Sequence, residues 1–526
     1  MSEEKNFIAS IYNPDNEAIY RILKRSGIEP YKCKDSRGYT ALHIASLNGN
    51  FSVIDFLIKY VESNFEGHQE KLKFWVNSVT DENFTPLHFA AFKGYLKILK
   101  RLLEVGGDVY ARNKQGLGLM HVAAQGDQAL ILAYLKEQGL KFDEVDEKGG
   151  IPLHWAAYMG CDIATGLLLS WGSFPDHQDH DGHTPLHLAT ISGQSRIIRN
   201  LLLKGATRKI FDSKNRTPMD LALENNQQNI VKMLKPPSLA SEFGLKPPLR
   251  PPKPNYVSVI SFLLLFCGGM GVNIVFNSQY CLSEFKYAYW GLIGMTMLVF
   301  AVVLLKDPGY IKPSNSSILE LYERFESHLV CPDCRVFRPA RSRHCQCCDR
   351  CVEKFDHHCP WVNNCIGARN LGWFFAFINL VWLSLAATIY LGLVVVSHTE
   401  NRNWVLSVSY QTSQLVAIIC ISGAGLFLVP VTLLLYVHYK NFALNLTTNE
   451  RFGKKHTDEN EESIMSFIRP KKGCFYNFKS MCCNSEVNRR VSKELRSLEE
   501  ESVEYEEIAR DYEKKYGTGL RSPLLE

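Results

Sequence analysis

The chain has 526 residues, of which 46% are hydrophobic and 21% are charged, and its formal net charge at pH 7 is +5. This modest charge says little about partners beyond solubility, and the mean hydropathy of -0.12 averages a strongly apolar part with a soluble half. The charged start Met1-Ser2-Glu3-Glu4-Lys5 is followed by no apolar core, which excludes a secretory signal peptide at this position.

The N-terminal part, residues 1–234, carries a sequence repeat. A Thr-Pro-Leu-His motif and its relatives recur every 33 residues, at His88, His121, His154 and His187, with Asp220 in the same place one interval later. This is the period of ankyrin repeats, which predicts a helical solenoid. An earlier copy, residues 40–43, lies 45 residues before the motif at 85–88, so about a dozen extra residues are expected around 61–73.

The repeat also explains its own histidines. Imidazole is a metal ligand, but a histidine at one fixed place in each repeat is expected to buttress the turn between units instead. Residues 13–27 are expected to form a leading helical cap. An ankyrin stack offers a concave surface to extended or folded partners. We expect the stack to recruit client proteins; a purely structural role, or regulation by an unrelated partner, is the alternative.

A proline-rich stretch separates the repeats from the apolar half. Residues 235–255 hold seven prolines, which indicates a semi-rigid polyproline spacer. Beyond it, four segments without Asp, Glu, Lys or Arg approach or exceed the length that crosses the hydrocarbon core of a bilayer: 257–276, 287–305, 373–397 and 415–436. Four such stretches rarely arise in one soluble core. The sequence therefore predicts two transmembrane helices within 256–305 and two more within 373–438, and an all-α membrane protein overall.

The connecting segments predict the orientation in the membrane. Residues 277–286 hold one Lys and residues 398–414 a single Arg, whereas the loop 306–372 and both termini are rich in Lys and Arg. The positive-inside rule places the N-terminus, this loop and the tail 439–526 in the cytosol. The reducing cytosol favours zinc thiolates and a free nucleophile over disulfides.

The loop 306–372 is rich in metal ligands. Eight of the sixteen cysteines and three histidines lie between positions 331 and 365, and tetrahedral zinc takes four such side chains. Two structural zinc ions would therefore use eight of them. Two C-x2-C pairs, Cys331 with Cys334 and Cys345 with Cys348, each need two partners from His344, Cys351, His358 and Cys365. The run Asp356-His357-His358-Cys359 has the composition of an activated thiolate nucleophile.

This window resembles the cysteine-rich domain of the DHHC protein S-acyltransferases. The resemblance implies one zinc held by Cys331, Cys334, His344 and Cys351, and a second held by Cys345, Cys348, His358 and Cys365. It leaves Asp356, His357 and Cys359 for catalysis and Cys347 without a role. Cys359 would take a fatty acyl group, palmitoyl above all, from acyl-CoA. His357 would accept the thiol proton, and Asp356 would orient its ring.

Shorter motifs point to the same family. Residues 307–309 resemble its DPG motif and residues 447–450 its TTxE motif, although the latter alone would be read as a helix N-cap. The resemblance implies a hydrogen bond from Thr448 to Asp356, a loose match of residues 473–477 to a C-terminal element with Asn477, and Trp361 and Phe374 near the acyl carbonyl. Basic residues of the loop, Arg338, Arg341 and Arg343, would lie near the CoA head group.

The combination of ankyrin repeats with this domain resembles the ankyrin-bearing branch of the family, which includes the huntingtin-interacting palmitoyltransferases. Those proteins carry more membrane helices before the Cys-rich loop than the two predicted here, so their recruitment rules stay open for this chain. The resemblance implies a multi-pass protein of the endomembrane system, the Golgi above all. Acyl-CoA, client proteins and membrane lipid would be its partners, and nucleic acid would not.

Two other functions are compatible with a Cys-rich zinc region. A zinc module that binds nucleic acid is disfavoured because Cys365 is soon followed by an apolar run rather than by a soluble basic helix. A membrane-tethered ankyrin scaffold or trafficking adaptor, with a purely structural zinc domain, has no need of Asp356, His357 and Cys359 together. In the tail, Cys474, Cys482 and Cys483 are candidates for acylation themselves, and the residues after 484 indicate a charged helix or disorder.

Overall fold

The computed structural model describes residues 3–12, 15–235, 256–277, 283–313, 315–397 and 407–452. The chain forms two compact units, Met1–Pro252 with Pro313–Phe337, and Lys253–Lys312 with Arg338–Glu526. Most of the predicted spacer and the tail beyond residue 452 lie outside the described residues. So do Asn477 and the tail cysteines Cys474, Cys482 and Cys483.

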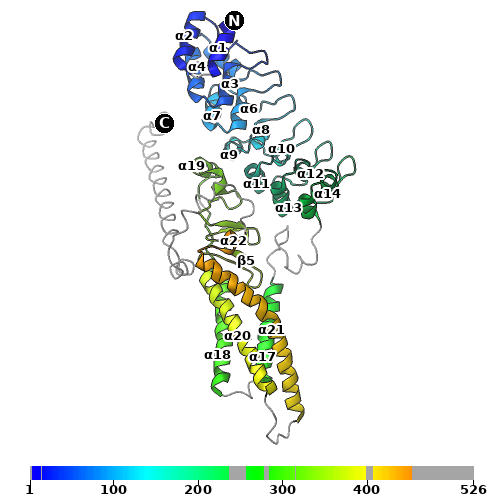
Figure 1. Ribbon diagram of the computed structural model, residues 1–526. Coiled ribbons are helices and arrows are strands. Elements are labelled where there is room, and N and C mark those ends of the chain that lie inside the picture. The colour runs from blue at the N-terminus through cyan, green and yellow to red at the C-terminus, as the bar shows by residue number, and fades with distance from the viewer. Residues whose placement is uncertain are drawn as a thin grey trace, which may run out of the picture. The chain divides into compact units, whose positions relative to one another are not determined.

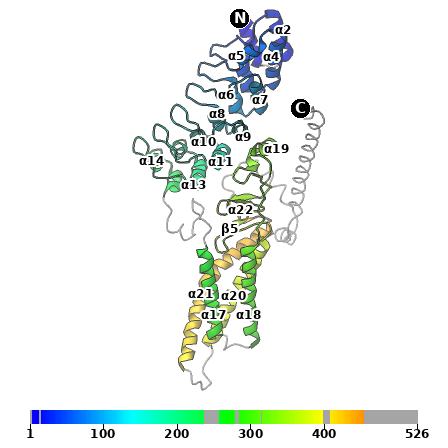
Figure 2. The same ribbon diagram turned by 180° about the vertical axis from the view of Figure 1, so that it is seen from behind.

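The first unit contains a stack of paired helices whose connecting loops project to one side (Figures 1 and 2). The inner helices α3, α6, α8, α10, α12 and α14 pack against one another in sequence order. The helices are α1 (Glu3–Tyr12), α2 (Asn16–Ser26), α3 (Ala41–Asn48), α4 (Phe51–Asn64), α5 (His68–Val76), α6 (Pro86–Lys93), α7 (Leu96–Glu104), α8 (Leu119–Gln125), α9 (Ala129–Glu137), α10 (Pro152–Met159), α11 (Asp162–Ser170), α12 (Pro185–Ile191), α13 (Ser195–Leu203), α14 (Pro218–Glu224) and α15 (Gln228–Leu234). The predicted solenoid and leading helix are confirmed, and the extra residues form the end of α4 and the added helix α5.

One histidine in each of five repeats joins that repeat to the next. In the first, the backbone N–H of Thr40 donates to Nδ1 of His43 at 3.0 Å, and Nε2 lies 2.9 Å from the carbonyl oxygen of Phe84. Because Nδ1 accepts a hydrogen bond from the amide, Nε2 carries the ring hydrogen and donates a hydrogen bond to the carbonyl oxygen of the next repeat. The same pair of contacts recurs at His88, His121, His154 and His187. The predicted buttressing role of these histidines is confirmed.

Residues 313–337 fold with the repeats, although the sequence assigns them to the Cys-rich loop. Helix α19 (Ile318–Arg324) packs against α9, and Leu321 and Val330 are buried in the same apolar core as the repeat helices. Two ion pairs add to this contact, Lys100 with Glu323 at 3.1 Å and Lys204 with Asp333. A short 3-10 turn, η2 (Ser327–Leu329), leads into a hairpin of β1 (Val330–Cys331) and β2 (Val336–Phe337).

The second unit carries the apolar helices α17 (Val257–Asn277), α18 (Ser283–Leu305), α20 (Leu371–Ser397) and α21 (Ser407–Ala443), followed by the short α22 (Thr448–Phe452) (Figure 1). Among the described residues, three segments are long and apolar enough to cross a membrane: Glu284–Leu305, Leu371–Ser397 and Thr412–Ala443. The described apolar part of α17, Val257–Asn273, is shorter. Large apolar side chains of α21 face outward, with Leu426 73% and Val429 65% exposed, as on a lipid-facing surface.

The expectation of an all-helical protein needs a correction in the Cys-rich region, which forms three antiparallel two-stranded sheets. Besides β1 and β2, they are β3 (Arg343–Cys345) with β4 (Arg350–Val352), and β5 (His357–Cys359) with β6 (Asn364–Ile366). Each turn contains a residue with positive φ: Arg335, Asp349 or Asn363. Closely spaced ligands and left-handed turn residues favour short hairpins over helices here.

Candidate active site and metal centres

Strand β5 separates the residues of the Asp-His-His-Cys run onto two faces. Successive side chains of a strand point to opposite faces, so His357 and Cys359 share one face and His358 lies on the other. The register pairs His358 with Cys365 and Cys359 with Asn364 across β6. One short strand can therefore serve a metal centre on one face and a nucleophile on the other.

The His358 face meets three cysteines. The Nδ1 atom of His358 lies 3.8 Å from Sγ of Cys345, 3.4 Å from that of Cys348 and 3.7 Å from that of Cys365. Four ligand atoms around a zinc ion at bond lengths of about 2.0–2.3 Å are separated by roughly 3.3–3.8 Å. The geometry and the donor set both fit a tetrahedral zinc site closed by four protein ligands.

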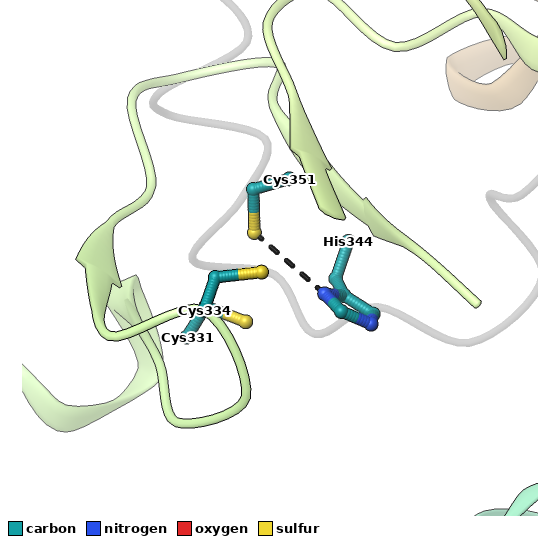
Figure 3. Close-up of side chains that lie close together, drawn as sticks. All are labelled: Cys331, Cys334, His344 and Cys351. Atoms are coloured by element: carbon teal, nitrogen blue, oxygen red, sulfur yellow. Dashed lines mark hydrogen bonds between the residues drawn. The ribbon is translucent and has the colours of Figure 1, made fainter. Parts of the chain in front are cut away.

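A second cluster has the same composition. Cys331 and Cys334 lie at the β1–β2 hairpin, and His344 and Cys351 form a cross-strand pair of β3 and β4. Their side chains converge in Figure 3, where Sγ of Cys351 lies 3.9 Å from Nδ1 of His344. The ligand atoms of each cluster all lie within 4.8 Å of one another. These two groups of four are the sets implied by the family resemblance, and both can hold zinc.

On the other face of β5, a carboxylate and an imidazole form a close pair. Oδ2 of Asp356 lies 2.7 Å from Nδ1 of His357, and the Asp356 side chain is only 1% exposed. Burial alone would raise the pKa of Asp356, but the hydrogen bond and charge of His357 hold that pKa below its usual range. Burial likewise opposes charge on His357, yet its hydrogen bonds to Asp356 and Cys359 raise its pKa to about 10. The ring is therefore held as an imidazolium at neutral pH.

Cys359 is buried, and its surroundings favour the thiolate. Burial alone would raise the pKa of the Cys359 thiol, but hydrogen bonding and charge from His357 lower it, as do backbone hydrogen bonds from Trp361 and Val362. A thiolate beside an imidazolium is the reactive form of a nucleophilic cysteine. The arrangement can therefore attack an electrophilic carbonyl carbon and carry the proton of the departing group.

The turn after α21 provides a hydrogen bond to the buried carboxylate of Asp356. The backbone N–H of Thr448 donates to Oδ1 of Asp356 at 2.6 Å, so the expected hydrogen bond is present, with the amide as its donor. Glu450 in the same turn binds Arg341 through two bonds of 2.6 and 2.8 Å, and both side chains are largely buried. Arg341, which the family resemblance implies near the CoA head group, has its guanidinium bound to this carboxylate.

Two polar anchors connect the strands to the end of α18. The amide of Asn364 donates to the carbonyl oxygens of Val303 and Lys306 at 3.0 Å each. Asp307 accepts the N–H groups of Gly309 and Tyr310, and its carboxylate pairs with Arg369 at 2.8 Å. The residues 307–309 thus fasten the Cys-rich loop where an apolar helix ends, which places Cys359 near the end of that helix.

Comparison with known proteins identifies this region. Residues 324–455 match the family model described as DHHC palmitoyltransferase, and residues 7–113 and 167–242 match that of ankyrin repeats. Residues 324–455 are a DHHC palmitoyltransferase domain. The DHHC domain thus contains both metal clusters, the Asp356–His357 pair and Cys359.

Curated relatives carry the same kind of name. Over 276 residues the chain is 30% identical to Palmitoyltransferase ZDHHC5-B of Danio rerio, a match of 49% of this chain and 40% of the relative. It is 37% identical over 260 residues to Palmitoyltransferase ZDHHC5 of Canis lupus familiaris, covering 46% and 34%. The human Palmitoyltransferase ZDHHC8 is 31% identical over 261 residues, covering 46% and 32%. The matches thus span at most two fifths of these relatives' lengths.

Around the site, the structure places two aromatic residues that the sequence analysis names and further residues that it does not. Phe374 contacts His357 edge to face at 5.2 Å between ring centres, whereas Trp361, also expected near the carbonyl, is 47% exposed. Asn364 and the Arg341–Glu450 pair carry no local signal, because their partners lie far along the chain. His438 is different: an ionisable residue at the end of an apolar stretch is itself a signal of function.

Proposed function

We propose that the chain is an integral membrane protein S-acyltransferase that moves a fatty acyl group, the palmitoyl group that the relatives' names indicate, from acyl-CoA to cysteines of client proteins. The observation that carries this proposal is the placement of Cys359 and His357, which is hydrogen-bonded to Asp356, on one face of β5, with the zinc ligand His358 on the other. A structural zinc domain alone has no need of a buried cysteine whose pKa is lowered by a neighbouring histidine.

The residues suit two successive acyl transfers. In the first, the Cys359 thiolate attacks the thioester carbonyl carbon, the bond from that carbon to the CoA sulfur breaks, and the leaving thiolate takes the proton of His357. In the second, neutral His357 removes the proton of the client thiol, whose sulfur attacks the acyl-cysteine and releases the Cys359 thiolate. Asp356 keeps the ring oriented and stabilises its charged form in both steps.

The two Cys3His clusters would hold structural zinc ions. With four protein ligands each, they leave no open coordination position, so their chemistry is to fix the hairpins that carry the nucleophile. His358 connects the two tasks, since it would bind metal while its neighbours in β5 act on the substrate. The strand cannot slip by one residue without exchanging these roles.

The membrane part would present the acyl chain to Cys359. We infer that α17 is a fourth membrane helix beside the three candidate spans, and that the charge distribution of the loops puts the repeats, the DHHC domain and the tail in the cytosol. The repeats would recruit client proteins. We also propose a location in endomembranes, the Golgi above all. The proposed segments are the ankyrin repeats at 1–234, the proline-rich linker at 235–255, the first two membrane helices at 256–305, the Cys-rich zinc-binding region at 306–372, the last two membrane helices at 373–438 and the cytosolic tail at 439–526.

Acyl-enzyme formation tests the proposal directly. Purified full-length protein in detergent should take label from palmitoyl-CoA in a hydroxylamine-sensitive linkage, and Cys359→Ser should take none. Cys267→Ser is a matched control, because Cys267 is an exposed cysteine of α17 outside the site. Retention of the label in Cys359→Ser, or a wild-type protein that never labels, would leave a membrane-tethered scaffold as the better description.

A further inference from the structure

His438 is a buried imidazole for which the described residues provide no hydrogen-bond partner. It lies on α21, is 1% exposed, and neither of its ring nitrogens is paired. Its neighbour Asn441, one turn later on the same helix, donates to Thr448 and accepts from Arg451. Buried polar groups are almost always paired, and leaving one unpaired costs folding free energy. The unpaired ring therefore leaves a hydrogen-bonding position open for a partner from beyond the described residues.

The position of His438 identifies where that partner would bind. Its ring centre lies 6.2 Å from that of His357 and 5.5 Å from that of Phe374, which also packs against His357. A group about 3 Å from a nitrogen of the His438 ring would form a hydrogen bond with it and would lie close to the Asp356–His357 pair.

We propose that His438 is a substrate-contacting residue whose ring N–H donates a hydrogen bond to the carbonyl oxygen of the acyl thioester. This inference rests on the proposed acyltransferase function. During attack by Cys359 that oxygen gains negative charge, and a donor already fixed in a buried site stabilises the charge more than it stabilises the ground state. His438 gives up no proton and forms no covalent bond; the atoms exchanged are those of the two transfer steps described above.

The contact predicts opposite effects on stability and on rate. His438→Phe removes both unpaired polar nitrogens and keeps an aromatic ring among Phe374 and Phe442. The melting temperature should therefore stay equal or rise. The single-turnover rate of hydroxylamine-sensitive labelling by palmitoyl-CoA should fall at least tenfold, since removal of one such donor costs roughly 100-fold or more in other enzymes. His438→Gln, which retains a donor, should recover part of the rate. Tyr436→Phe, at a 62% exposed position of the same helix, is the matched control and should match wild type.

Each outcome decides the inference. Labelling of His438→Phe at the wild-type rate overturns it, and so does a parallel loss of rate and melting temperature in both the Phe and Gln variants, which would make the residue structural. A slow but stable Phe variant with partial recovery in Gln supports it. If the wild-type protein takes no label while its melting is cooperative, the acyltransferase proposal itself has failed, which is a different result.

Discussion

The ion pair of Arg341 with Glu450 offers the sharpest test of how the site is supported. The two side chains are 13% and 11% exposed and are joined by two hydrogen bonds. Arg341→Met leaves the Glu450 carboxylate buried without its cation. Breaking one partner of such a pair costs about 3–5 kcal/mol of unfolding free energy. Methionine is a better replacement than glycine, because Arg341 has a φ of 69°. Glycine would relieve backbone strain there and so hide part of the lost stability.

Arg341→Met should also slow the acylation of Cys359. The turn that carries Glu450 also carries the Thr448 amide, which donates to Asp356, so a loosened turn should slow acylation as well as lower stability. Denaturant unfolding of the purified protein in detergent, followed by its intrinsic tryptophan fluorescence, measures the first effect. Single-turnover labelling measures the second.

Two further variants make this prediction refutable. Arg343→Met removes an exposed arginine that binds Asn449 in the same turn, and it should change stability by less than about 0.5 kcal/mol. Arg341→Met with Glu450→Leu removes both buried charges and should recover part of the stability lost in the single variant. If Arg341→Met unfolds at the wild-type midpoint, or no more easily than Arg343→Met, the reasoning is wrong.

Three other predictions concern the metal sites, the repeats and a close backbone contact. His358→Ala should lose zinc and fold poorly, whereas His357→Ala should keep two zinc ions and lose rate; equal zinc loss by elemental analysis would contradict the assignment. Burial lowers the pKa of four repeat histidines to about 4, namely His43, His88, His121 and His154. Since the unfolded pKa is about 6.5, the unfolded chain binds protons first, and stability should fall as the pH drops from 7 to 5, by roughly 2 kcal/mol per histidine. A repeat domain whose denaturation midpoint is unchanged over this range would refute it. Finally, Gly367→Ala would place a Cβ 2.6 Å from Val352 Cγ1 and 2.7 Å from the Pro308 carbonyl oxygen. We expect a loss of about 1–3 kcal/mol, whereas Gly423→Ala, with open space around it, should melt normally.

Features with a local cause were predictable from the sequence. The 33-residue period requires only that each unit repeat its neighbour. The histidine at the fixed position forms the same two hydrogen bonds in five repeats. The apolar segments follow from bilayer thickness, although the helices run past the predicted ends: α21 continues to Ala443, beyond residue 436, and its extension contains the buried polar residues His438 and Asn441. The metal clusters needed the family resemblance, since spacing left the ligand pairs unsorted.

The repeat array, the apolar segments and the thiols and imidazoles around Cys359 can be identified in the sequence alone. Which of these groups meet depends on the tertiary structure. The fold of residues 313–337 with the repeats, the 109-residue separation closed by Arg341 and Glu450, and the burial of His438 beside His357 all depend on packing between distant segments. Periodicity and ligand composition depend on residues that are close in the sequence. A contact between residues a hundred positions apart forms only when the helices and hairpins pack together.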